Sequence, residues 1–331
     1  MQQKLQTLLQ IVSNVENLLI LPHNNPDPDA LASAAALQYL LTQKSTTRCK
    51  ILYNGIVGRA ENKALVNYMN LAIETDENTE TTLAALIDTQ PDAGNITLPS
   101  GVQVVIIIDH HHKTSDTSAV AFKDIRTNVG ATSTILVDYL KVAGVDIPKW
   151  LATALFYGIK TNTLGLSRNA GHSDAAAYYF LQPQIDVKGL ASIEHARVTA
   201  QYFKSLDRAL RNARFYNGLI ISNLGDINYP DLVAEIADQL LRLENVRWVI
   251  CAGAFNQTLI LSVRTRRRKD NAAKLVQTLV QMGGTTGGHG TIAGGQIPLS
   301  GQSQEELINQ LTAHALNALN IAVDTPGIAL I

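Results

Sequence analysis

Apolar runs of strand length alternate with helically periodic stretches through the first half of the chain. Each run ends in polar residues and is followed by a segment whose apolar positions recur every three to four residues. The expected strands are residues 17–21, 48–53, 83–88 and 102–109, and the expected helices are residues 29–43, 61–69, 132–143 and 149–157, the last with Gly158 just past its end. This alternation predicts an α/β fold with a mostly parallel sheet flanked by helices.

The pattern changes after residue 181. Residues 185–206 read as one long, polar helix that serves as a linker. The expected strands beyond it are residues 215–222, 246–254 and 258–264, and the expected helices are residues 231–241, 271–282 and 304–319. Because 331 residues exceed a comfortable single core, we expect an N-terminal domain of residues 1–187, a helical linker of residues 188–211, and a smaller α/β domain of residues 212–331.

The connection after the first strand carries ligand-type side chains. Residues 23–29 read His-Asn-Asn-Pro-Asp-Pro-Asp, and ligands bind at this edge of open α/β sheets. A proline before each aspartate stiffens the loop, so Asp27 and Asp29 should point to different sides, with one carboxylate per ion and His23 free to join either. Asp29 also begins a helix, where the dipole favours negative charge. Carboxylates this close repel unless a cation lies among them, which predicts half of a metal site.

Two further strands end in residues of the same kind. Asp109, His110 and His111 follow the apolar run 104–108, and Asp88 follows the run 83–87. A single aspartate at a strand end is most often a turn former, but three such strand ends in order favour a site. Carboxylates and imidazoles without thiolates suit Mn²⁺ or Mg²⁺ better than structural zinc. Two such ions about 4 Å apart would clamp the attacking and leaving oxygens of a phosphoryl displacement.

Glycine and arginine residues stand out near the end of the chain. Seven glycines lie among residues 283–295 and surround His289. Such a run lets backbone N–H groups approach a ligand, although glycine content alone is equally typical of a plain loop. It matches neither a Walker loop nor a dinucleotide fingerprint. Residues 266–269 read as a solvated turn, whereas Arg264, still in a strand, is the better candidate for a buried phosphate contact.

Composition narrows the class of partner. Apolar residues make up 46% and charged residues 17%, as in ordinary soluble proteins. A net charge of −1 argues against long nucleic acid, duplex included, but not against a short anionic ligand held by a local patch. Cys49 and Cys251 are too few and too isolated for a disulfide framework, which indicates a reducing, cytoplasmic setting. The sequence shows no signal-peptide pattern and no run of the roughly eighteen apolar residues that a membrane span needs, so no membrane partner is expected.

These segments together resemble the DHH phosphoesterase family in its two-domain form with a DHH-associated C-terminal domain. Residues 23–33 match the first motif, residues 88–89 resemble the second, and residues 109–111 match the third, which gives the family its name. Residues 287–289 with residues 293–294 resemble the glycine-histidine signature of the C-terminal domain. Within the family, the length and architecture are most similar to the small oligoribonucleases that also dephosphorylate 3′-phosphoadenosine 5′-phosphate.

The resemblance implies a role for each candidate residue. The implied metal ligands are His23, Asp27, Asp29, Asp88, His110 and Asn162, the catalytic residues are Asp109 and His111, and the substrate-binding residues are Arg264, Gly287, Gly288 and His289. By resemblance, His23, Asp27 and Asp88 hold one Mn²⁺, and Asp29, Asp88 and His110 hold a second, with Mg²⁺ or another divalent ion as alternatives. A metal-bridging hydroxide attacks phosphorus beside His111. The substrate-binding residues seat its far end across a cleft between the domains.

Two positions depart from the family pattern. The fourth motif places an aspartate in Gly-Ile-x-x-Asp-Thr, but residues 158–163 put Asn162 there. An amide oxygen can ligate but brings no negative charge, so we expect one metal to bind firmly, the second weakly, and activity to be reduced or lost. Thr286 stands where the glycine signature usually begins with another glycine, which bears only on the local loop shape.

Three functions remain open from the sequence. The leading hypothesis is a hydrolase that degrades short RNA from an end to 5′-nucleotides, and that also accepts 3′-phosphoadenosine 5′-phosphate. The alternatives are a phosphodiesterase for cyclic dinucleotides or their linear products, and a nucleotide-binding protein weakened in catalysis by Asn162. Inorganic pyrophosphatase activity is disfavoured, because family members with that activity have a differently built C-terminal domain. The oligomeric state stays open, a homodimer included.

Overall fold

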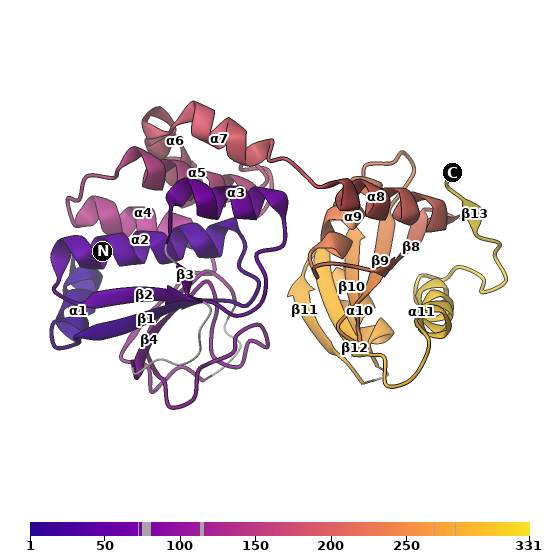
Figure 1. The fold of residues 1–331 in the computed structure, drawn as a ribbon, viewed down its shortest axis with the longest axis horizontal. Helices are drawn as coiled ribbons and strands as arrows, with labels where there is room; N and C mark the ends of the chain where they lie inside the picture. Colours follow the sequence, from indigo (N-terminus) through magenta and orange to yellow (C-terminus); the bar gives the residue numbers. More distant parts are fainter. Residues whose placement is uncertain (72, 75–80, 113–115, 268, 282) are drawn as a thin grey trace. The chain divides into compact units, whose positions relative to one another are not determined.

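The chain forms two compact α/β units, Met1–Ala196 and Arg197–Ile331. The computed structural model describes residues 1–331 apart from residues 72, 75–80, 113–115, 268 and 282. Each unit contains its own sheet and its own helices (Figure 1), which confirms the predicted fold class. Within the described part of the chain, no helix combines the length and the apolar character needed to cross a membrane.

A parallel sheet forms the centre of the first unit. Its described strands lie in the order β3-β2-β1-β4-β5-β6, and all of them pair in parallel. They are β1 (Asn17–Pro22), β2 (Arg48–Leu52), β3 (Ile73–Glu74), β4 (Leu83–Ile87), β5 (Gln103–Asp109) and β6 (Phe122–Ile125). The strand order reverses between the neighbours β1 and β4, and ligands of open α/β sheets bind at such a switch point.

Helices cover one face of this sheet, as Figure 1 shows, and loop segments contribute to the apolar cluster on the other face. The helices of this unit are α1 (Gln2–Val12), α2 (Pro28–Lys44), α3 (Ala60–Met69), α4 (Thr132–Val142), α5 (Lys149–Asn162), α6 (His172–Leu181), the 3₁₀ turn η1 (Gln182–Gln184) and α7 (Val187–Glu194). The Ala-rich start of α2 is buried on all sides between the sheet, α4 and α5. Small side chains there let three helices approach one another closely.

Two helix predictions were wrong. Helix α5 was expected to end before Gly158 but continues to Asn162. Gly158 is a packing residue, because a Cβ atom on it would lie 2.6 Å from Ser133 Oγ and 3.1 Å from the Cα of Asp29. The single long helix expected over residues 185–206 is instead divided into α7 and α8 (Ala200–Asn212) by a non-helical segment. Helix α6 was not anticipated.

The second unit has a mixed sheet between two helical layers. Its described strands lie in the order β11-β12-β10-β9-β8-β7-β13, parallel only between β8 and β9. They are β7 (Arg214–Tyr216), β8 (Leu219–Asp226), β9 (Trp248–Phe255), β10 (Thr258–Thr265), β11 (Thr285–His289), β12 (Ile292–Pro298) and β13 (Ile328–Ala329). Helices α8 and α9 (Leu232–Leu240) pack on one face, and α10 (Ala272–Leu279) and α11 (Gln304–Ala318) pack on the other. The last residue of the helix predicted over 271–282, Met282, lies outside the described residues.

The glycine-rich segment is a β-hairpin, not a plain loop. Strand β11 pairs antiparallel with β12, so that Gly287 faces Gly294 and Gly288 faces Ala293. Gly288 has φ +122°, and a Cβ atom on it would lie 2.5 Å from the Cα of Ala293. Glycine is therefore required here by close strand approach and by backbone conformation.

Candidate metal centre

The loop after β1 places His23 and Asp27 beside the sheet edge. Asp27 caps α2, since its carboxylate accepts a hydrogen bond from the N–H of Ala30 at 3.0 Å. His23 Nδ1 lies 2.9 Å from the carbonyl oxygen of Asn24, which places the ring proton on Nδ1 and a lone pair on Nε2. That Nε2 lies 3.9 Å from Asp27 Oδ1 and 3.7 Å from Asp88 Oδ2.

Asp88 is the buried centre of the cluster. It follows β4 with φ +60°, a left-handed conformation that is uncommon for a residue with a side chain. Its Oδ1 accepts a hydrogen bond from the Thr132 hydroxyl at 2.7 Å and lies 3.5 Å from His110 Nε2. Burial, followed by the nearby charges of Asp29 and Asp27, raises the pKa of Asp88 well above its ordinary value. Such crowding of carboxylates is relieved by a cation.

Asp109 fixes the two histidines that follow β5. Its Oδ1 accepts hydrogen bonds from His111 Nδ1 at 2.8 Å and from the N–H of His110 at 2.8 Å, and its Oδ2 accepts from Gln90 Nε2 at 2.7 Å. Burial alone would raise the pKa of Asp109, but these contacts with His111 and Gln90 outweigh it and hold the pKa below its usual value. The His111 side chain is 40% exposed, against 12% for His110 and 15% for His23, so it is the most accessible to a substrate of these three imidazoles.

The pKa values of the two adjacent imidazoles shift in opposite directions. Burial and the neighbouring His111 ring, whose centroid is 4.2 Å away, lower the pKa of His110. Burial would lower the pKa of His111 as well, but the hydrogen bond to Asp109 outweighs it and raises that pKa. His110 is thereby favoured as a neutral, metal-binding ring and His111 as a proton carrier.

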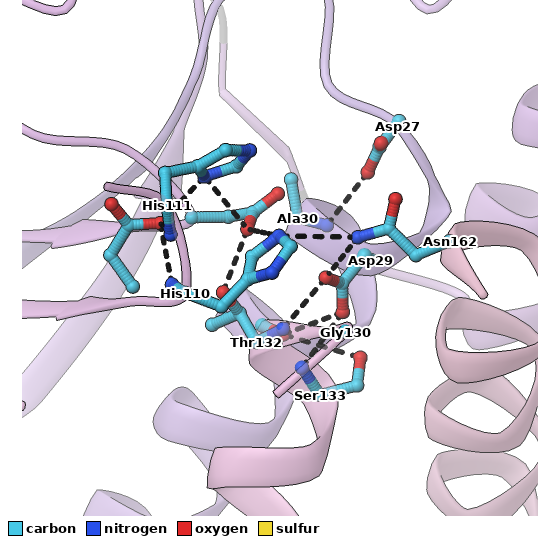
Figure 2. Close-up of polar contacts among 12 residues, drawn as sticks. Asp27, Asp29, Ala30, His110, His111, Gly130, Thr132, Ser133 and Asn162 are labelled. Atoms are coloured by element: carbon cyan, nitrogen blue, oxygen red, sulfur yellow. Dashed lines mark hydrogen bonds and ion pairs between the residues drawn. The ribbon is translucent and has the colours of Figure 1, made fainter. Parts of the chain in front are cut away.

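Asp29 has a different environment from the other acidic residues. It is fully buried at the start of α2 and faces the N-terminus of α4 (Figure 2). Its carboxylate accepts hydrogen bonds from the N–H groups of Thr132 at 2.8 Å and Ser133 at 2.7 Å, and from Asn162 Nδ2 at 2.8 Å. Burial raises the pKa of Asp29, while the His110 and Ser133 contacts act against that shift.

Two groups of three ligand-type side chains share Asp88. They are His23, Asp27 and Asp88, and Asp88, His110 and His111, with the ligand atoms of each group within 4.8 Å of one another. Among the described residues, Asp29 belongs to neither group. Carboxylate oxygens and imidazole nitrogens fit Mn²⁺ or Mg²⁺, and the repulsion among the buried carboxylates is the physical reason to expect an ion there.

The residues predicted to bind substrate all lie in the second unit. Arg264 of β10 is buried, its Nε donates to Asp238 Oδ1 at 2.7 Å, and its Nη1 donates to the carbonyl oxygen of Val263 at 3.2 Å. Gly287, Gly288 and His289 lie in β11. Ile292 of β12 pairs with both Arg264 and His289, so the three strands bring these residues to one level of the sheet.

The sequence did not identify Thr132 or Gln90 as part of this centre. Thr132 contacts both Asp88 and Asp29, whereas the sequence marked it only as the first residue of the helix expected over residues 132–143. Gln90 is buried and donates to Asp109 and also, at 3.3 Å, to the carbonyl oxygens of His111 and His112. No pattern distinguishes it from an ordinary turn residue.

The fold and the centre define an α/β protein with carboxylate and imidazole side chains, which could hold a divalent cation, at the carboxyl edge of a parallel sheet. The chain belongs to the DHH family: residues 17–159 match the family model described as DHH family, N-terminal domain, and residues 217–318 match that of the DHHA1 domain.

Known proteins are similar to this chain to different extents. The uncharacterized protein MJ1633 of Methanocaldococcus jannaschii is 34% identical over 309 residues, which cover 91% of this chain and 63% of that protein. A probable manganese-dependent inorganic pyrophosphatase of Brevibacillus brevis is 32% identical over 174 residues, 50% of this chain and 54% of that protein. The chain thus spans between half and two thirds of these relatives. The crystal structure of an exopolyphosphatase-related protein from Bacteroides fragilis has the same fold, with a TM-score of 0.72 over 96% of both chains at 15% identity.

Proposed function

We propose that the chain is a Mn²⁺-dependent phosphoesterase that degrades short oligoribonucleotides from an end to 5′-nucleotides and also removes phosphate from 3′-phosphoadenosine 5′-phosphate. The observation that carries this proposal is the pair of ligand groups that share the buried Asp88. The manganese dependence in the name of the Brevibacillus brevis relative supports the choice of ion. That similarity covers half of this chain, so the substrate is argued separately.

The side chains of the centre have different proposed roles. His23, Asp27 and Asp88 would hold one ion, and His110 would be a ligand in the other group around Asp88. A bound divalent ion supplies positive charge that stabilises the negative phosphoryl oxygens, and it lowers the pKa of a coordinated water. Asp109 accepts the Nδ1–H of His111 at 2.8 Å and so orients this ring. His111 would protonate the leaving oxygen from Nε2 as the phosphorus–oxygen bond breaks.

The second unit favours a nucleotide over pyrophosphate as the substrate. The relative named as a pyrophosphatase matches only about half of the chain, whereas residues 217–318 match the DHHA1 domain. Arg264, Gly287, Gly288 and His289 are proposed to bind a phosphate of the substrate, since a guanidinium and backbone N–H groups suit phosphate. A net charge of −1 favours a short ligand over long nucleic acid.

Four substrates test the proposal. The full chain with Mn²⁺ is incubated with a 5′-phosphorylated diribonucleotide, 3′-phosphoadenosine 5′-phosphate, cyclic di-AMP and pyrophosphate, and the products are separated by chromatography. We expect mononucleotides from the first and AMP from the second. Turnover of cyclic di-AMP or pyrophosphate alone would assign a different substrate. Tight binding of a nucleotide without turnover of any of the four would assign a binding protein instead.

Asp88→Asn provides the control for the chemistry. It keeps the size of the side chain but removes the charge common to both ligand groups, so Mn²⁺-dependent turnover should be lost. Asp92→Asn removes an acidic charge from the loop after β4, at a position with no assigned role in the centre, and should leave turnover unchanged. Equal activity in both variants would contradict the proposed site.

A further inference from the structure

Asn162 lies against two residues that the family pattern assigns to a second metal ion. Helix α5 continues past Gly158 and brings this side chain to the sheet edge. Its Nδ2 lies 2.8 Å from Asp29 Oδ2 and 3.4 Å from His110 Nε2. Figure 2 shows the amide reaching toward both groups. The amide nitrogen is thus within hydrogen-bonding distance of both.

The surrounding hydrogen bonds determine which end of the amide faces these partners. His110 Nδ1 lies 3.3 Å from the carbonyl oxygen of Val129, which places the ring proton on Nδ1 and leaves Nε2 as an acceptor. Asp29 offers only acceptors when ionised. Because both partners accept, the NH₂ end of Asn162 fits between them, whereas the carbonyl end would set lone pairs against lone pairs.

Asp29 is already provided with donors from the protein. Besides Asn162, the N–H groups of Thr132 and Ser133 donate to it, and the Ser33 hydroxyl lies at 3.4 Å. These N–H groups open α4, whose helix dipole favours a negative charge at this end. The carboxylate is fully buried, so the donors replace the water it has lost. The protein itself thus supplies the hydrogen-bond donors that the Asp29 carboxyl group needs.

We propose that the Asn162 amide takes the structural place of a second cation, and that this chain binds one Mn²⁺ tightly, at His23, Asp27 and Asp88. An aspartate at residue 162 would add a third carboxylate beside Asp29 and Asp88, and their repulsion would call for a second ion. Asparagine removes that charge and supplies the donor. The inference rests on the proposed metal-dependent function and replaces the two-ion arrangement that the family resemblance implied.

Metal stoichiometry tests the inference without any activity measurement. The full chain and Asn162→Asp are saturated with Mn²⁺, passed through a desalting column and analysed for bound metal. Spin resonance then distinguishes a single ion from a coupled pair. We expect one Mn²⁺ per wild-type chain and two, spin-coupled, in Asn162→Asp. Asn169→Asp adds a carboxylate at an exposed position after α5 and should remain at one. Two tightly bound ions in the wild-type chain, or one in both the wild type and a folded Asn162→Asp, would overturn the proposal.

Turnover of the diribonucleotide separates this inference from the function on which it rests. One bound ion without turnover of any substrate would leave the stoichiometry standing and refute the proposed function. Two bound ions with turnover would refute the one-ion stoichiometry and leave the proposed function standing. A wild-type chain that retains no Mn²⁺ would refute both. Because the decisive comparison is made on the wild-type chain, it holds even if Asn162→Asp fails to fold.

Discussion

Replacing Thr132 by valine removes one hydroxyl group from a fully buried position and leaves a side chain of nearly the same shape. That hydroxyl donates to Asp88 Oδ1 at 2.7 Å. The backbone N–H of residue 132, which valine keeps, donates to Asp29 at 2.8 Å. The substitution therefore deletes one contact, made to the carboxylate that both ligand groups share, and leaves the start of α4 in place.

The size of the effect follows from the burial of the acceptor. Leaving a buried acceptor without its donor costs about 1–3 kcal/mol, so the free energy of unfolding should fall by about 2 kcal/mol. Loss of a partner that orients a metal ligand typically weakens metal binding roughly 10–100-fold, and we expect Mn²⁺ affinity to fall within that range. Thr132→Ser keeps the hydroxyl and should stay close to the wild type in affinity.

Thr134 provides a matched control on the same helix. Its hydroxyl is also buried and donates to a carboxylate, Asp174 Oδ1, at 2.6 Å, but Asp174 is outside the metal centre. Thr134→Val should therefore lose similar stability in urea unfolding while its Mn²⁺ affinity by titration calorimetry stays unchanged. If Thr132→Val and Thr134→Val lose the same affinity, or neither loses any, the assignment of Thr132 as the residue that positions Asp88 is wrong.

Three further predictions concern other parts of the chain. The pKa of Asp124 is lowered because hydrogen bonds from Arg126 and Lys4 outweigh its burial; its contribution to stability is therefore present above about pH 4 and lost as pH falls through the folded-state pKa, and the stability gap between wild type and Asp124→Asn should narrow in acid unfolding curves. Gly158→Ala should lower the free energy of unfolding by about 1–3 kcal/mol despite better helix propensity, because the added methyl meets Ser133 Oγ; an unchanged or raised melting temperature would contradict this. Arg264→Lys should raise KM for the diribonucleotide more than it lowers kcat, since a lysine lacks the planar fork of donors; a change confined to kcat would place Arg264 outside substrate binding.

The metal-type residues were predictable because strand ends are predictable. An apolar run that ends in an aspartate fixes both the strand and the edge at which the aspartate emerges, and parallel strands bring their carboxyl ends to the same edge. Asp88 and Asp109 were placed correctly on this basis, and residues 23–29 follow β1 as expected. Local sequence is sufficient to predict a candidate site residue when that residue directly follows or ends a strand.

The remaining features depend on contacts between distant segments. Gly158 reads as a helix stop, but here its missing side chain lets α5 pack against α2 and α4 and carries Asn162 to the centre. The glycines of β11 and β12 read as a loop because their strand role appears only when the two segments pair. Thr132 looks like the first residue of a helix and Gln90 like a turn residue, and their hydrogen bonds to Asp88 and Asp109 exist only in the folded chain.

The strain and charge at Asp88 connect the fold to its chemistry. A left-handed conformation at a residue with a side chain costs about 1–3 kcal/mol and persists only where the surroundings enforce it. Here the N–H of Asp88 is bonded to the carbonyl oxygen of Ile108 in β5 at 3.0 Å, and Thr132 of α4 holds the carboxylate. The neighbouring strand β5 ends at Asp109 and is followed directly by His110, so the strand that holds Asp88 in this conformation also positions another candidate ligand. An ion that relieves the repulsion at Asp88 binds only the folded arrangement and so stabilises it, by about 2.7 kcal/mol at a hundred times its Kd. If Mn²⁺ binds at this edge as proposed, metal binding and folding are coupled, and a substitution that weakens one should be detectable in the other.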